Sequence, residues 1–185
     1  MPYYNTQQGL HIFGAGMQKS VIYNQINDPN KKSPGGPAIS ITRDPEDTRT
    51  FQQTGMIRDL QITSDPKIDG SVGIDMQATW AYTIQHVRIM RMGSHGLILR
   101  NHFWNGMTSE YDVCENVHFD HVVSEYNGGW GILVDTVERN ASTGFLHMER
   151  CKLQQIKEVD YNGQAKSGWL SAVESMAMAS IPKAQ

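Results

Sequence analysis

The stretch Ile57-Arg58-Asp59-Leu60-Gln61-Ile62, followed by Gly73-Ile74-Asp75-Met76, decides the fold of this 185-residue chain. Apolar and polar residues alternate in the first phrase, and a glycine leads a short apolar triplet in the second. A period of two is typical of β-strands, because successive side chains point to opposite faces. Three further copies of this pair of phrases follow, at Ile84–Ile89 with Gly96–Leu99, Val113–Phe119 with Gly131–Val134, and Phe145–Leu153 with Gly168–Leu170.

A unit that recurs every few tens of residues and cannot bury its own apolar side is typical of a stacked solenoid. Because the repeated elements are strands, we predict an all-β fold, a single-stranded parallel β-helix. The unequal spacing of the copies predicts loops of variable length between fixed strands. Equivalent positions are expected to be Leu60, Val87, Val117 and Cys151 in the first phrase, and Ile74, Leu97, Ile132 and Trp169 in the second.

The domain organisation follows from where this pattern starts and stops. Residues 1–170 are predicted to form the β-helix domain, and residues 171–185 a tail that includes a short capping helix. Strand-like sequence starts within ten residues of Met1, with no amphipathic helix ahead of it to cover the first strand edge. We therefore expect the chain to be a fragment of a longer helix.

Composition excludes several classes of partner. The net charge of −3, without a run of basic residues, predicts no nucleic-acid partner. No apolar stretch approaches the roughly 18 residues of a membrane span, so no membrane partner is expected either. Cys114 and Cys151 each lie inside a strand phrase, which favours small buried residues over a disulfide or metal site.

Several phrases resemble a known family. The segments Gly9–Met17 and Ser20–Ile22 are similar to the opening turns of pectate-lyase-like β-helices, particularly those of bacteriophage tailspikes and capsule depolymerases. Ile57–Ile62 and His95–Leu99 are also similar, and the resemblance extends over about residues 9–170. It implies a right-handed helix, often a homotrimer in a virion tail, that binds or cleaves a polysaccharide. The fold alone does not establish that chemistry.

The alternation also predicts which side chains leave the core. In a parallel sheet, equivalent outward positions on neighbouring strands lie about 4.8 Å apart, so they form rows. A mixture of carboxylates, imidazoles and cations should therefore meet on one face. One expected row contains Gln61, Arg88, His118 and Lys152, and the next contains Asp59, His86, Asn116 and Arg150, with Asp120 one step further along its strand.

This face offers the residue types for two polysaccharide reactions. Glycoside hydrolysis uses two carboxyl groups flanking the scissile bond, which Asp120 with Asp59 or Glu125 would supply. β-Elimination uses a base and a cation that stabilises the developing uronate charge, and Arg88, His118 and Lys152 are the residue types required. The alternative is a solvated face on which opposite charges pair across strands. Our candidate catalytic residues are Asp120, His118, Arg88 and Asp59.

Aromatic rings on loops suit sugar binding, because a ring covers the apolar face of a pyranose while polar neighbours bond its hydroxyls. The alternative is that the tryptophans cover strand ends and that His95 bonds the backbone of its own turn. Calcium-loop spacing is absent, so we expect no metal ligands and no cofactor. Our candidate substrate-binding residues are Trp104, Tyr126, Trp130, His95 and Lys152.

A second outward row, which runs through Asp75, Ile98 and Leu133, is mainly apolar. Such a strip suggests packing against a neighbouring chain of a trimer, and coverage by a loop of the same chain is the alternative.

The sequence thus predicts a polysaccharide-recognising module of a tailspike or tail fibre, with or without cleavage activity, in a virion tail. One alternative is a secreted, extracellular bacterial polysaccharide lyase or glycoside hydrolase of the same superfamily. The other is a purely structural β-helix segment.

Overall fold

The computed structural model describes residues 11–25, 35–42, 52–64, 68–77, 79–100, 114–135, 143–144, 146–153 and 156–159. Within these ranges every regular element is a β-strand, and all the strand pairs are parallel. The predicted all-β chain with parallel strands is thereby confirmed. No helix in the described part of the chain is long and apolar enough to cross a membrane. The predicted tail, residues 171–185, lies outside the described residues.

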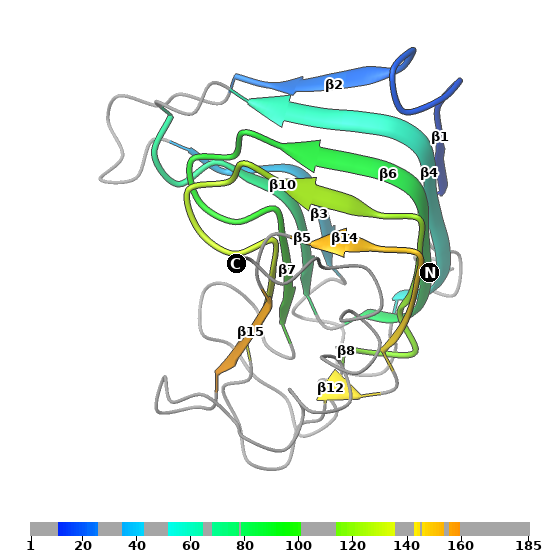
Figure 1. Ribbon diagram of the computed structural model, residues 1–185. Helices are drawn as coiled ribbons and strands as arrows, with labels where there is room; N and C mark the ends of the chain where they lie inside the picture. Colours follow the sequence, from blue (N-terminus) through cyan, green and yellow to red (C-terminus); the bar gives the residue numbers. More distant parts are fainter. Residues whose placement is uncertain are drawn as a thin grey trace, which may run out of the picture.

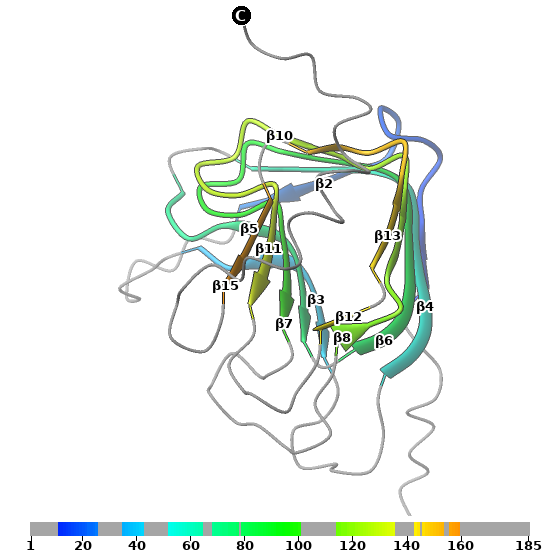
Figure 2. The ribbon, with the colours of Figure 1, turned by 60° about the horizontal axis from the view of Figure 1, so that its bottom comes forward.

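The strands form two sheets, and the chain passes from one to the other (Figure 1). The larger sheet contains β1 (His11–Phe13), β2 (Val21–Asn24), β4 (Gln52–Ser64), β6 (Thr79–Met90), β8 (Cys114–Glu115), β9 (His118–Asp120), β10 (Val123–Glu125), β12 (Thr143–Gly144), β13 (His147–Glu149) and β14 (Lys152–Leu153). The smaller sheet contains β3 (Pro37–Thr42), β5 (Val72–Gln77), β7 (Leu97–Arg100), β11 (Ile132–Asp135) and β15 (Ile156–Val159). Figure 2 shows the strands of the smaller sheet side by side, across from β4, β6 and β13.

The smaller sheet has the register that the sequence predicted for its first three copies. Ile74 pairs with Leu97, and Leu97 pairs with Ile132. The fourth assignment is wrong, because Ile156 rather than Trp169 pairs with Ile132. Trp169 itself lies outside the described residues.

The larger sheet departs from the predicted register at the third copy. Leu60 pairs with Val87 as expected, but Arg88 pairs with Val123, so Val122 takes the position predicted for Val117. His118 lies instead opposite Thr83, on an earlier part of β6. It therefore does not belong to the row of Gln61 and Arg88, as the sequence suggested.

The physical reason is a corner between two strand segments. Asp59, His86, His121 and Arg150 hold equivalent places in the register, and all four have left-handed backbone, with φ of 59°, 50°, 55° and 51°. A left-handed residue turns the chain and interrupts the two-residue alternation. The third copy thus has one apolar set before its corner and another after it. The phrase Val113–Phe119, identified in the sequence, contains only the set before the corner.

Two more pairs of left-handed residues mark further corners. Trp80 and Glu115 are register partners, and the residues directly after them, Ala81 and Asn116, both have φ of 55°. Arg91 and Tyr126 also follow a register pair, with φ of 60° and 59°. Asn116 is therefore in a different corner from His86, which corrects the second predicted row: His121 takes its place.

The glycine that leads each apolar triplet has a steric explanation. Gly73, Gly96 and Gly131 follow one another across the smaller sheet, with Ile74 N donating to Gly96 O at 3.1 Å and Leu97 N donating to Gly131 O at 3.0 Å. A Cβ on Gly73 would lie 2.4 Å from Gly96 O, and one on Gly96 would lie 2.7 Å from Gly131 O. The backbones approach too closely for a side chain.

The core lies between the two sheets and is mainly aliphatic. Ile57, Leu60 and Ile62 of the larger sheet and Ile74 and Met76 of the smaller one are at most 2% exposed. Burying each such side chain contributes about 1.5–3 kcal/mol.

The prediction of buried cysteines is confirmed for Cys114 and holds only in part for Cys151. Cys114 is fully buried and Cys151 is half-buried, and among the described residues neither cysteine belongs to a disulfide.

The apolar outward strip differs from the prediction. Asp75, Ile98 and Leu133 do lie in one row. However, Asp75 is 5% exposed and Ile98 is 3% exposed, so these two residues are not available to a neighbouring chain. Arg100 donates from Nε to Asp75 at 3.0 Å and from Nη1 to Asp135 at 3.1 Å. A ladder of ion pairs therefore runs beside the strip.

Replacement of Gly96 by alanine tests the close approach in the smaller sheet. Because the added methyl group would meet Ser124 Oγ and Gly131 O, we expect Gly96→Ala to lower the free energy of unfolding by about 1–3 kcal/mol. Urea denaturation measures it, with Ser40→Ala at an exposed strand position as the control. Equal stability of Gly96→Ala and the wild type would contradict the packing described.

Candidate functional site

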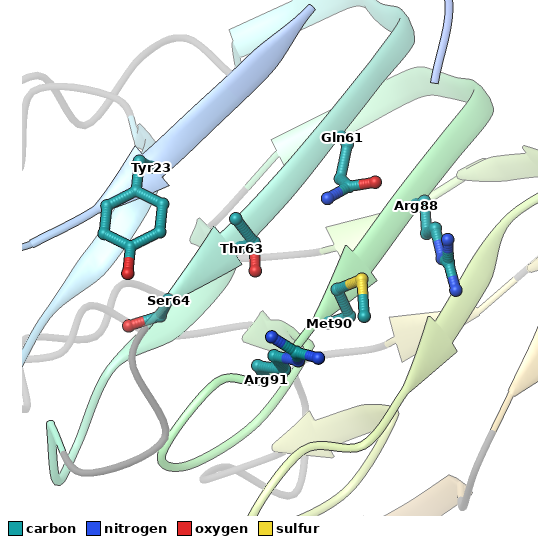
Figure 3. Close-up of a pocket in the computed structure, with 7 residues that line it drawn as sticks. All are labelled: Tyr23, Gln61, Thr63, Ser64, Arg88, Met90 and Arg91. Atoms are coloured by element: carbon teal, nitrogen blue, oxygen red, sulfur yellow. The ribbon is translucent and has the colours of Figure 1, made fainter. Parts of the chain in front are cut away.

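An open hollow of about 510 Å³ lies on the outer face of the larger sheet, beyond the corner. Figure 3 shows its side chains on three neighbouring strands, β2, β4 and β6, together with that of Arg91 directly after β6. One register row of the hollow contains Tyr23, Thr63 and Met90. The full lining consists of Tyr23, Gln61, Thr63, Ser64, Arg88, Met90 and Arg91.

The alternation after the corner directs these side chains outward. Val87 and Ile89 are buried, whereas the intervening Arg88 and the following Met90 are half-buried. The same phase holds on β4, where Gln61 and Thr63 alternate with buried Leu60 and Ile62. Parallel, in-register pairing then brings the outward side chains of neighbouring strands together.

Glu125 joins two cations of this face. Arg88 Nη2 donates to Glu125 Oε1 at 2.7 Å, and Lys152 Nζ donates to Glu125 Oε2 at 2.7 Å. The carboxylate is buried, and the hydrogen bonds from Lys152 and Arg88 hold its pKa below the ordinary glutamate value despite burial. Glu125 is therefore ionised at neutral pH and acts as a fixed negative charge between two cations.

Asp120 forms a similar buried cluster before the corner. It is 5% exposed and accepts hydrogen bonds from Gln85 Nε2 at 2.8 Å and from Arg150 Nε at 3.0 Å. These bonds, first from Gln85 and then from Arg150, lower the pKa of Asp120 more than burial raises it. Asp120 is thus a carboxylate at neutral pH.

This ionisation limits the chemistry that the face can perform. The general acid of a glycoside hydrolase must hold a proton near neutral pH, which requires a raised pKa. Asp120 and Glu125 both have lowered pKa values. They suit ion pairing, and the arrangement favours binding over acid-assisted hydrolysis.

Asp59 lies at the corner and faces imidazoles. Its Oδ1 is 3.2 Å from His86 Nδ1, and its Oδ2 is 3.4 Å from Arg58 Nε. The His86 ring in turn packs against His121, with centroids 5.3 Å apart. Asp59 and His86 are neighbours, as the predicted row had them, and His121 rather than Asn116 takes the third position.

The other predicted residues divide into three groups. Lys152 joins the hollow's edge through Glu125, and Tyr126, which follows Glu125, is 67% exposed. His95 Nδ1 accepts a hydrogen bond from the backbone N of Trp130 at 2.9 Å, so it bonds the backbone of the next copy rather than that of its own turn. Trp104 lies outside the described residues.

The lining residues Tyr23 and Arg91 were missed from sequence. Tyr23 lies on β2, which precedes the first clear repeat, and its register with Thr63 follows only from the pairing of β2 with β4. Arg91 follows a strand and has left-handed backbone, so alternation did not reach it. A search for polar residues one position beyond the strand phrases would have found it.

Comparison with protein-family models, characterised proteins and solved structures finds no match for this chain.

Acid should destabilise the protein through its two buried carboxylates. Because the folded-state pKa values of Asp120 and Glu125 are lowered, their stabilising contribution is complete above the ordinary values, about 3.9 and 4.3. It is lost as pH falls through the lowered folded-state values. We expect the free energy of unfolding to fall in this acidic window. Urea denaturation at a series of pH values from about 7 to about 3 measures this fall.

Glu125→Gln isolates one of these contributions. The variant should lose about 1–3 kcal/mol of stability at neutral pH and show a weaker dependence on acid than the wild type. A matched control is Asp69→Asn, since Asp69 is an exposed carboxylate in a turn between β4 and β5. Identical acid profiles for Glu125→Gln and the wild type would contradict the lowered pKa of Glu125.

Proposed function

We propose that the chain is a polysaccharide-binding module built on a right-handed parallel β-helix. In-register parallel pairing, alternate passage of the chain between two sheets and corners at equivalent positions all support this fold. The hand follows from the strong preference of parallel crossover connections for right-handed turns. The resemblance of the strand phrases to tailspike helices supports the same architecture.

The hollow on the larger sheet carries the functional proposal. It is open and combines an aromatic ring, amide and hydroxyl groups, and guanidinium groups. The Tyr23 side chain is 52% exposed, so its ring is available to stack on a pyranose. Gln61 and Thr63 offer hydrogen bonds to hydroxyls, as a carbohydrate requires.

The cations favour an acidic polysaccharide. Arg91 is exposed, and within the described ranges it forms no ion pair. Arg88 is about one-third exposed and uses one terminal nitrogen for Glu125. A guanidinium recognises a carboxylate through two parallel hydrogen bonds, so uronates or other carboxylate-bearing sugars are the matching ligands.

A β-eliminating lyase is the second candidate. The specific observation in its favour is that cations border a face whose two buried carboxylates stay ionised. Elimination next to a uronate needs charge stabilisation and a base rather than a protonated carboxyl group. Glycoside hydrolysis is disfavoured by the same ionisation.

A phage tailspike or tail fibre, assembled as a homotrimer in the virion tail, is the proposed setting. The strand-phrase resemblance supports it. The buried state of Asp75 and Ile98 means that a trimer interface would use surfaces other than that strip.

Binding and cleavage assays on acidic and neutral capsular polysaccharides test this proposal. We expect binding to acidic polymers, and Arg91→Ala to weaken it by roughly tenfold or more, because a hydrogen bond to a charged group contributes about 1.5–3 kcal/mol. Tyr23→Ala should also weaken it. New ultraviolet absorbance of unsaturated uronates would select the lyase, and new reducing ends without absorbance the hydrolase.

Arg58→Ala is the matched control, because Arg58 is an exposed arginine before the corner that contacts Phe13 and Asp59 rather than the hollow. Equal binding of Arg91→Ala and Arg58→Ala would remove the hollow from the account. Absence of binding to every polysaccharide would favour the purely structural alternative.

A further inference from the structure

A second cluster on the larger sheet lies apart from the hollow, before the corner. His118 of β9 and His147 of β13 are register partners on neighbouring parallel strands. Glu149, two residues after His147, projects from the same face of β13. Each residue offers one ligand atom, and these three atoms all lie within 4.8 Å of one another.

The imidazole rings of this cluster are already close. The centroids of His118 and His147 are 4.7 Å apart, with the planes inclined at 73°. His147 Nε2 lies 2.8 Å from Glu149 Oε1. Ligand atoms that share a tetrahedral zinc ion at about 2.0–2.1 Å are about 3.3–3.4 Å apart, so side-chain rotations would bring the three atoms onto one ion.

An independent observation indicates that this cluster lacks a partner. His118 Nε2 is buried and has no hydrogen-bond partner within the described residues. A buried polar nitrogen without a partner is costly, because it has lost its water. His147 and Glu149 are hydrogen-bonding partners of each other, but this contact leaves His118 Nε2 without a partner among the described residues.

We propose that His118, His147 and Glu149 bind a divalent transition-metal ion, with zinc as the best match. Two imidazoles and one carboxylate are a common zinc ligand set. The side chains of His147 and Glu149 are 52% and 50% exposed, so solvent reaches the cluster and water can complete the coordination. The ion would bridge β9 and β13 and satisfy His118 Nε2.

This inference does not depend on the proposed glycan binding, because no residue of the cluster lines the hollow. It also goes beyond the sequence, from which no metal ligand set was expected. The three ligands come from two strands whose pairing the repeat pattern placed incorrectly.

Titration of the chelator-treated 185-residue chain with zinc chloride at neutral pH tests the site. Calorimetry should show one ion per chain, and Co²⁺ should give visible d–d absorption on binding. We expect His118→Ala and His147→Ala to weaken zinc binding by at least about tenfold, since even loss of an outer-shell partner costs about 10–100-fold.

His121→Asn is the matched control. His121 is an exposed histidine on the same sheet that also stacks on a neighbouring imidazole, and asparagine tolerates its left-handed backbone. It should bind zinc as the wild type does. Circular dichroism checks that each variant is folded. If a histidine variant unfolds, Glu149→Gln, at an exposed position, tests the metal site in its place. Absence of stoichiometric binding, or equal affinity in Glu149→Gln and the wild type, would overturn the proposal.

Discussion

The register of the larger sheet depends on a row of left-handed corner residues. Asp59, His86, His121 and Arg150 turn the chain at equivalent places, and the segments on either side pair in parallel and in register. Non-glycine residues adopt this conformation at a cost of about 1–2 kcal/mol, so the surrounding packing must maintain it. Because these corners set the register, they decide which side chains lie together in each outward row.

Ion pairing organises the outward face that the corner creates. Before the corner, buried Asp120 is bonded to Gln85 and Arg150, and after it, buried Glu125 is bonded to Arg88 and Lys152. In both clusters the carboxylate is largely shielded by longer side chains from neighbouring strands. The face thus combines fixed charges with an adjacent open hollow, and the proposed binding of an acidic polysaccharide rests on this arrangement.

The repeat phrases predicted the strands, their parallel pairing and most of the core. They worked because buried Leu60 and Ile62 alternate with polar residues after the corner and pair in register with Val87 and Ile89. They failed at the third copy, where Val117 and Val122 lie on opposite sides of a corner. Alternation predicts the inward positions only along a straight strand. A single left-handed residue changes which of the following positions point inward.

The candidate site was predictable only in part, for the same reason. Arg88 and Lys152 were placed together correctly, whereas His118 was assigned to their row and lies in another, opposite Thr83 and His147. The role of Glu125 depends on contacts between strands separated by 27 and 37 residues in the chain. Such partners follow from the register and not from local spacing.

Pairwise cysteine cross-linking tests this register most directly. In a background of Cys114→Ala and Cys151→Ser, cysteines replacing Arg88 and Val123 should form a disulfide under mild oxidation, because in-register neighbours lie within the usual Cα range of about 4.4–6.8 Å. Cysteines replacing Arg88 and His118 should not. Cross-linking of the second pair but not the first would contradict the corner and the outward face built on it.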